Sequence, residues 1–101
     1  MVFIYTTCET MEEAEKLGTL IITQKIGACV DFWPIKSCYN WEGGLQCVSQ
    51  AMLLVTTLES KLDPVTQLIH DNHTYSVPLI AGADIRRMNH DYKEWMMNEI
   101  Q

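Results

Sequence analysis

Three histidines and four cysteines are the side chains of this sequence that could hold a metal ion or carry out thiol chemistry. His70 and His73 are three positions apart, so a continuous helix would present both on one face, where they could share a divalent metal ion. In the alternative, which we favour, His70 lies in the last turn of a helix, where a positive charge suits the helix dipole, and His73 hydrogen-bonds a neighbouring strand from a loop. His90 lies beside the start of another helix, where we expect it to be solvated.

The cysteines are Cys8, Cys29, Cys38 and Cys47, and no two of them have the Cys-x-x-Cys spacing of zinc fingers and thioredoxins. Thiolate and imidazole ligands together favour Cu(I) or Zn(II), so Cys8 and Cys29 are the cysteines to consider as partners of a histidine. Alternatively, the cysteines pack as small hydrophobic residues, with Cys29 in the core of a central strand. Because no signal peptide opens the sequence, we expect all four thiols to be reduced.

Length and charge narrow the classes of function. The 101 residues predict one domain over 1–101, and 48% hydrophobic residues can build a core that needs no metal or cofactor for folding. The net charge of −6 argues against nucleic-acid binding, which requires a dense Lys/Arg surface. No apolar run approaches the length of a membrane span. We therefore expect a cytoplasmic protein with neither nucleic acid nor membrane as a partner.

The first elements follow from local signals. Residues 2–7, VFIYTT, are typical of a buried strand. Thr10 and Glu13 form a capping box, which predicts a helix that begins there and runs to about Ile26, with Gly27 as its C′ residue. Residues 28–41 and 45–58 then form two long strands around a turn at 42–44. Pro34 predicts a kink or bulge and an edge position, and a symmetric turn would place Cys38 opposite Cys47.

The second half repeats the pattern. A helix begins near residues 59–65, with Ser60 as its N-cap and Pro64 in the first turn. The segment YSVPLIAGADI, residues 75–85, predicts a strand in which Pro78 marks an edge or a bulge. A final helix begins at Asn89, and we expect one of its faces to carry Tyr92, Trp95, Met96 and Ile100.

The predicted order, β-α-β-β-α-β followed by a helix, is that of an α+β, ferredoxin-like sandwich with both helices on one face of the sheet. The hairpin strands are long for this fold, so the hairpin should protrude. Its apolar side chains, which are hard to bury within one chain, predict a homo-oligomer. An aromatic set could line a ligand cleft between protomers, although we favour plain interface packing: Tyr39, Trp41, Tyr75, Tyr92 and Trp95.

Three motifs carry a family resemblance. The stretches GACVDFWPIKSCYNWEGGL, HTYSVPLI and NHDYKEWMMNEI resemble, in order, segments of the divalent-cation tolerance (CutA) family. The resemblance covers essentially the whole chain. It implies a ferredoxin-like protomer, a tight homotrimer, and a shape shared with the PII signalling proteins. It also implies association with copper and other divalent metals and with cellular tolerance of them, and it implies no settled enzymatic activity.

The chain departs from this family at several positions. Thr74 stands where the family has a Pro, Leu79 where it has a Glu, and Thr56 where it has a Lys. Of the metal ligands that some members use, only His73 has a counterpart, because the other two positions hold Thr6 and Asn72. We therefore expect His73 to be a better ligand than His70. Cys8 compensates for Thr6 only if the first strand ends late enough to turn its sulfur inward.

Three hypotheses follow. The first is a trimeric CutA-like protein that binds copper or another divalent metal and acts without turnover. The second is a PII-like signalling scaffold with a small anionic ligand in the cleft between subunits. The third, an enzyme, is least favoured because no nucleophile and base occur at the spacing of a known motif.

Overall fold

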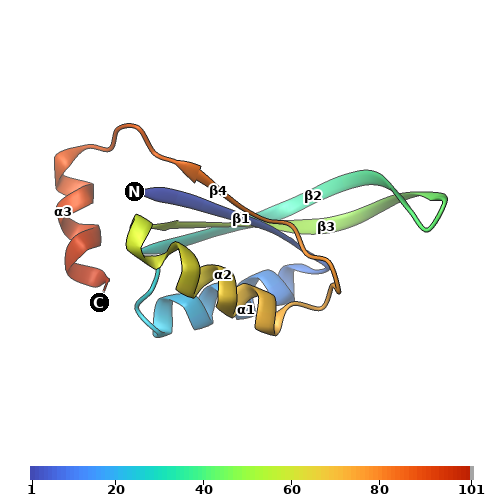
Figure 1. Ribbon diagram of the computed structural model, residues 1–101, viewed down its shortest axis with the longest axis horizontal. Coiled ribbons are helices and arrows are strands. Elements are labelled where there is room, and N and C mark those ends of the chain that lie inside the picture. The colour runs from blue at the N-terminus through green and yellow to red at the C-terminus, as the bar shows by residue number, and fades with distance from the viewer. Residues whose placement is uncertain (101) are drawn as a thin grey trace.

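A four-stranded antiparallel sheet forms the framework of the protein in the computed structural model, which describes residues 1–100 (Figure 1). The strand order is β2-β3-β1-β4, so the two βαβ halves interleave as predicted for a ferredoxin-like fold. In chain order the elements are β1 Val2–Cys8, α1 Met11–Thr23, β2 Cys29–Trp41, β3 Gly44–Thr57, the 3-10 helix η1 Glu59–Lys61, α2 Leu62–Asn72, β4 Ile80–Asp84 and α3 His90–Glu99.

Helices α1 and α2 lie together on one face of the sheet (Figure 1). Alternate residues of β1 are fully buried toward them, and this period of two is that of a strand with one covered face. The helices contribute an apolar stripe each, so one core forms between the two layers. Its buried members include Val2, Ile4, Cys8, Ala14, Leu17, Ile21, Ala51, Leu53, Val55, Val65, Leu68 and Ile69.

Strands β2 and β3 form a hairpin that extends beyond the helices and gives the molecule a long axis of 46 Å (Figure 1). None of residues 37–48, here called the hairpin arm, is buried. At its tip Glu42 has φ +52° and Gly43 φ +79°, the two left-handed residues of a type I′ turn. The pairing keeps one register from Cys29–Thr56 to Trp41–Gly44. The predicted edge position of Pro34 is confirmed, but the predicted bulge is wrong, because an edge strand accommodates a proline without one.

Two helix boundaries differ from prediction. Helix α1 ends at Thr23, and Lys25 takes the left-handed conformation, with φ +59°, that was expected of Gly27. Gly27 is needed for a different reason, because a Cβ there would lie 2.5 Å from Ile21 Cγ2. Ser60 is not an N-cap but lies within η1, and α2 begins at Leu62 with Pro64 in its first turn.

The fourth strand is shorter than predicted, because β4 comprises only Ile80–Asp84, the residues that pair with β1. Residues 75–79, around Pro78, lie outside it. Proline lacks the N–H that a strand ladder uses, so regular pairing begins only after it. Helix α3 packs at the opposite end of the sheet from the hairpin arm through Met96 and Ile100. Its N-cap is Asn89, as predicted.

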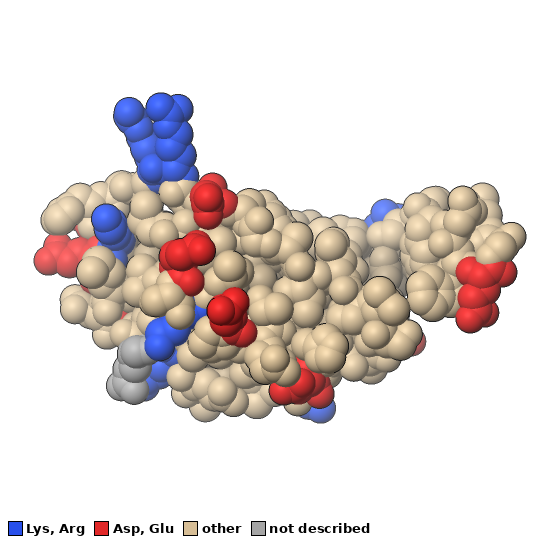
Figure 2. All heavy atoms as spheres, in the orientation of Figure 1, with Lys and Arg blue, Asp and Glu red and all other residues tan. Residues whose placement is uncertain are grey.

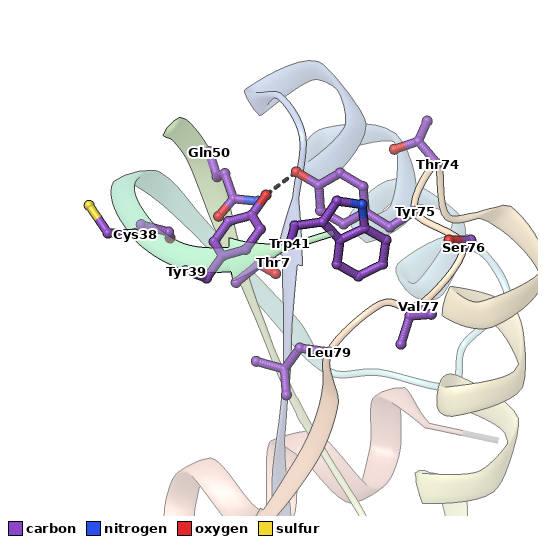
Figure 3. Close-up of a pocket in the computed structure, with 11 residues that line it drawn as sticks. Thr7, Cys38, Tyr39, Trp41, Gln50, Thr74, Tyr75, Ser76, Val77 and Leu79 are labelled. Carbon is purple, nitrogen blue, oxygen red and sulfur yellow. Dashed lines mark hydrogen bonds between the residues drawn. The ribbon is translucent and has the colours of Figure 1, made fainter. Parts of the chain in front are cut away.

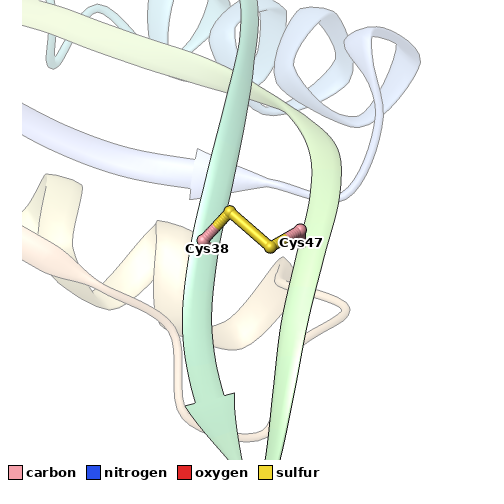
Figure 4. The surroundings of a disulfide bond; sticks show 2 residues. All are labelled: Cys38 and Cys47. Carbon is pink, nitrogen blue, oxygen red and sulfur yellow. A yellow bond between two sulfur atoms is a disulfide. The ribbon is translucent and has the colours of Figure 1, made fainter.

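The hairpin arm contains a disulfide between Cys38 and Cys47 (Figure 4). The two residues are directly paired, as a symmetric turn predicts, and their Cα atoms are 4.1 Å apart. The expectation that all four cysteines are reduced is therefore wrong for this pair. That expectation gave too little weight to a register that brings two sulfur atoms together. Cys8 and Cys29 are free thiols.

Candidate functional site

One cluster of potential metal ligands joins three elements at the end of the core that faces the hairpin arm. Cys8 is the last residue of β1, Glu13 lies in the first turn of α1, and His73 caps the C-terminus of α2. One ligand atom from each, a thiol sulfur, a carboxylate oxygen and an imidazole nitrogen, lies within 4.8 Å of the other two. Cys8 was expected to compensate for Thr6 only if the first strand ended late enough to turn its sulfur inward. The structure meets this condition, because β1 continues to Cys8 and its side chain is buried.

Both ring nitrogens of His73 are engaged in hydrogen bonds. Its Nε2 lies 2.8 Å from the carbonyl oxygen of Thr7, and the backbone N–H of Tyr75 donates to its Nδ1 at 3.0 Å. A carbonyl can only accept, so the ring is the neutral tautomer with the proton on Nε2. The side chain is fully buried. These are the bonds of a loop histidine fixed to a neighbouring strand, the structural role predicted for it.

Glu13 connects the start of α1 to the loop after α2. Its carboxylate accepts hydrogen bonds from the backbone N–H groups of Glu9 and Thr74, both at 2.8 Å, and from the Thr74 hydroxyl. Burial raises the pKa of this carboxyl group, but the bonds from Thr74 and Glu9 and the nearby His73 outweigh it, so the pKa lies below its usual value. The sequence identified Glu13 only as a capping residue, although that role fixes it beside the end of β1.

Cys8 is fully buried, and this burial, with a contribution from the Glu13 charge, raises the pKa of its thiol to about 12. The thiol is therefore protonated at neutral pH, and it must lose its proton before it can bind a metal ion.

The cluster fits a borderline or soft divalent ion. One sulfur, one nitrogen and one oxygen ligand are donors that Zn²⁺ and copper accept. Ligand atoms at normal Zn²⁺ bond lengths lie roughly 3–4 Å from one another, so small side-chain movements would close a cluster spanning 4.8 Å. Binding through Nδ1 of His73 would break its bond to Tyr75. The cost of that bond, together with the proton on Cys8, predicts weak binding at neutral pH.

The structure does not bring His70 or Cys29 into this cluster. The side chain of His70 is 64% exposed and lies 3.6 Å from Asp71. Cys29 is at the start of β2, where its thiol faces the carboxylate of Asp31. Burial and the charge of Asp31 raise the pKa of this thiol. Neither residue belongs to a group of three or more potential ligands in the described part of the chain.

A groove of about 620 Å³ lies next to the cluster, between the hairpin arm and the loop that follows α2 (Figure 3). Tyr39, Trp41 and Tyr75 line it, and the amide of Gln50 donates a hydrogen bond to the Tyr75 hydroxyl. The other two predicted aromatic residues, Tyr92 and Trp95, pack against each other on α3, with ring centroids 5.3 Å apart and ring planes at 57°. The predicted aromatic set therefore forms two separate groups.

The distribution of charged side chains does not single out the ligand cluster or the groove. On the face shown in Figure 2, acidic side chains are scattered over the body, and the hairpin arm is largely uncharged. The lining of the groove contains no Lys, Arg or His. Among residues 1–100, no helix is long and apolar enough to cross a membrane.

Comparison with known proteins shows which protein family the chain belongs to. The family described as CutA1 divalent ion tolerance protein matches residues 2–99, and the chain belongs to this family. The resemblance carried by the three sequence motifs is thereby confirmed. Two solved structures share the fold over nearly the whole chain. CutA1 from Oryza sativa is 36% identical, with a TM-score of 0.95 over 99% of this chain and 93% of that one. The periplasmic divalent cation tolerance protein CutA from Archaeoglobus fulgidus is 30% identical, with a TM-score of 0.96 over the full length of both.

Among named relatives, the chloroplastic protein CutA of Arabidopsis thaliana is 36% identical over 99% of this chain and 56% of its own length. The divalent-cation tolerance protein CutA of A. fulgidus is 30% identical over 98% of this chain and 97% of its own. The chain thus spans a little over half the length of the plant relatives it matches. The A. fulgidus relative is named as a divalent-cation tolerance protein. The plant relatives are named as chloroplastic and the A. fulgidus structure as periplasmic, so a cytoplasmic location of this chain stays a prediction.

Proposed function

We propose that this protein binds a divalent metal ion, copper or zinc, through Cys8, Glu13 and His73, and that it contributes to metal tolerance by binding and not by turnover. The observation that carries the proposal is the cluster itself, in which a thiol, a carboxylate and an imidazole from three elements come within 4.8 Å of one another. Membership of a divalent ion tolerance family supports it. His70 and Cys29, which lie elsewhere, are not included.

Each ligand has a separate role. Cys8 would supply the soft ligand that favours copper or zinc over magnesium or calcium. Glu13 would supply negative charge, and its carboxylate is already oriented by the hydrogen bonds that it accepts from the backbone N–H groups of Glu9 and Thr74. His73 would supply a neutral nitrogen, while its bond to the Thr7 carbonyl keeps the proton on the other ring nitrogen.

Isothermal titration with Zn²⁺ and Cu²⁺ tests the proposal, with His70→Ala as the matched control for His73→Ala. Binding should weaken strongly in His73→Ala and hardly change in His70→Ala, because only His73 lies in the cluster. Binding should also strengthen as the pH rises, since the Cys8 thiol, with a pKa of about 12, must lose its proton. Equal loss in both variants would favour a paired-histidine site, and unchanged binding in His73→Ala would leave the cluster a structural network.

We also propose that the protein is a homotrimer. Helices α1 and α2 both lie on one face of the sheet, and on the other face Trp33 and Trp41 are 41% and 47% exposed. Large apolar side chains that are left exposed in this way favour an interface with another copy. Light scattering at micromolar concentration should give about three times the chain mass of 11.6 kDa.

Trp41→Ala should weaken assembly by about 3–5 kcal/mol if the indole is buried between copies. Trp95→Ala is the matched control, because this tryptophan is similarly exposed but lies on α3, away from the hairpin arm. A mass of one chain for the unchanged protein would exclude the trimer.

The second candidate, a PII-like scaffold for a small anionic ligand, is not favoured. A phosphate or carboxylate needs a cationic or N–H-rich site, and the groove offers no basic side chain from this chain. Titration with ATP should therefore give no binding, whereas saturable binding would revive this candidate.

A further inference from the structure

The disulfide of the hairpin arm lies on a different face from the aromatic wall of the groove. From Ala51 and Leu53, whose side chains are buried toward the helices, a period of two along β3 places Cys47 on the helix side of the sheet. Its partner Cys38 therefore lies there too. Cys38 is among the residues that line the groove, but in Figure 3 its sulfur points away from the aromatic lining residues. Tyr39 and Trp41, on the opposite face of the same strand, line the groove.

The register makes this pair suited to reversible bonding. Trp41 and Gly44 flank the two-residue turn, which makes them a hydrogen-bonded pair. Hydrogen-bonded and non-hydrogen-bonded pairs alternate along an antiparallel ladder, so Cys38 and Cys47 are a non-hydrogen-bonded pair, the closer of the two kinds. Their Cα separation of 4.1 Å agrees with this. The register therefore brings the two sulfur atoms close enough to bond.

Access separates this pair from the other two cysteines. Cys38 and Cys47 are exposed, with no helix over them, whereas Cys8 is fully buried and Cys29 is half-buried. A small thiol in solution can therefore reach the sulfur atoms of the pair directly. An accessible disulfide is the kind that exchanges with thiols, because exchange requires a thiolate to approach the sulfur that it attacks.

We propose that Cys38 and Cys47 form a thiol–disulfide switch that exchanges with low-molecular-weight thiols and sets the mobility of the groove wall formed by Tyr39 and Trp41. In reduction, one small thiolate attacks a sulfur of the pair, gives a mixed disulfide and releases the first cysteine. A second small thiolate attacks the small-molecule sulfur of that mixed disulfide and releases the second cysteine. The products are two protein thiols and one small disulfide, and oxidation is the reverse.

The consequence for the groove follows from position. The bond lies immediately beside Tyr39 and on the body side of Trp41, so it clamps the last part of the ladder before the turn. Within a single chain no core supports this part of the hairpin, because none of residues 37–48 is buried. Without the bond, the tip is held by a few exposed backbone hydrogen bonds, which open more easily than buried ones. The switch acts on the groove and does not depend on metal binding at Cys8, Glu13 and His73.

The test equilibrates the full chain with mixtures of glutathione and glutathione disulfide at several ratios and follows the pair by mass and by mapped alkylation. We expect the protein to gain and lose two daltons reversibly at Cys38 and Cys47 within this range. Hydrogen exchange at the Tyr39 and Gln46 amides should become several-fold faster on reduction, while exchange in the buried part of the same strand, at Leu53, stays unchanged. Cys29→Ser should behave as the original protein, and the double variant Cys38→Ser/Cys47→Ser should show the faster exchange at every ratio.

Three results would overturn the proposal. A pair that stays oxidised in excess glutathione would be a static cross-link, and a pair that stays reduced in excess glutathione disulfide would form no switch. Reversible oxidation without any change in hydrogen exchange at the Tyr39 and Gln46 amides would show that the disulfide does not affect the mobility of the groove wall.

Discussion

The two ends of the β2–β3 hairpin show how one antiparallel ladder is stabilised in two ways. At the base, the strands are covered by α1 and α2, and residues such as Leu53 and Val55 are fully buried. In the hairpin arm, the same register continues without any cover, and Leu45 is 71% exposed. There the ladder depends on a type I′ turn and a disulfide. The base is therefore stabilised by burial of its side chains. The hairpin arm is stabilised by its turn and its disulfide.

The largest difference between the two regions should come from truncating a leucine in each. Leu53→Ala removes a buried side chain from the base and should lower the free energy of unfolding by about 2–5 kcal/mol. Leu45→Ala, in the same strand but exposed, should change it by no more than about 0.5 kcal/mol. Urea denaturation at one fixed protein concentration measures both. Leu45 lies on the opposite face of the hairpin arm from Trp41, so a cost at Leu45 close to that at Leu53 would show that another copy covers this face as well.

Adding a methyl group should give the next largest contrast. In Gly27→Ala the new Cβ would lie 2.5 Å from Ile21 and 3.0 Å from Val55, so the base must shift, at a cost of about 1–3 kcal/mol. In Gly44→Ala, in the hairpin arm, the nearest atom lies at 3.8 Å, and the change should stay within about 0.5 kcal/mol. Thermal melts of the two variants compare them directly. Equal melting temperatures would mean that the base is more loosely packed than its contacts indicate.

In the part of the sheet that α1 and α2 cover, the same substitution at two threonines should have opposite effects on stability. The Thr6 hydroxyl is buried and has no hydrogen-bond partner among the described residues. Thr6→Val should therefore stabilise the protein by about 1 kcal/mol. The Thr57 hydroxyl donates to the Ile26 carbonyl at 2.6 Å, so Thr57→Val should destabilise it by about 1–3 kcal/mol. Denaturant unfolding gives both values, and a loss of stability in Thr6→Val would indicate a partner for its hydroxyl.

The smallest effect should be the contribution of Glu13, in α1, to the way the free energy of unfolding depends on pH in acid. Its folded-state pKa lies below the ordinary value of 4.5, so its contribution is complete above about that pH and is lost as the pH falls through the folded-state pKa. Glu13→Gln should remove this part of the acid dependence, whereas Glu12→Gln, at an exposed neighbour, should keep it. Unfolding measured from pH 7 to pH 3 tests the difference. Matching profiles for Glu13→Gln and the unchanged protein would contradict it.

The sequence alone determined those features that depend on neighbouring residues. The β-branched and aromatic residues of β1, the capping threonine of α1 and the two-residue turn at Glu42 and Gly43 are local signals. They led to the correct element order, strand pairing and hairpin register. They also placed Cys38 opposite Cys47. The motifs of the hairpin and of the two later segments were sufficient for the family.

Only the tertiary structure decided what depends on residues distant in the chain. It brought Glu13 to the end of β1 and to the loop after α2, so a capping residue became a potential ligand beside Cys8 and His73. It also showed that position 27 requires a glycine because of close packing against Ile21, and not because the helix ends there. It also divided the aromatic residues between the groove and α3. Such distances are set by how layers pack, and no local pattern of residue types encodes them.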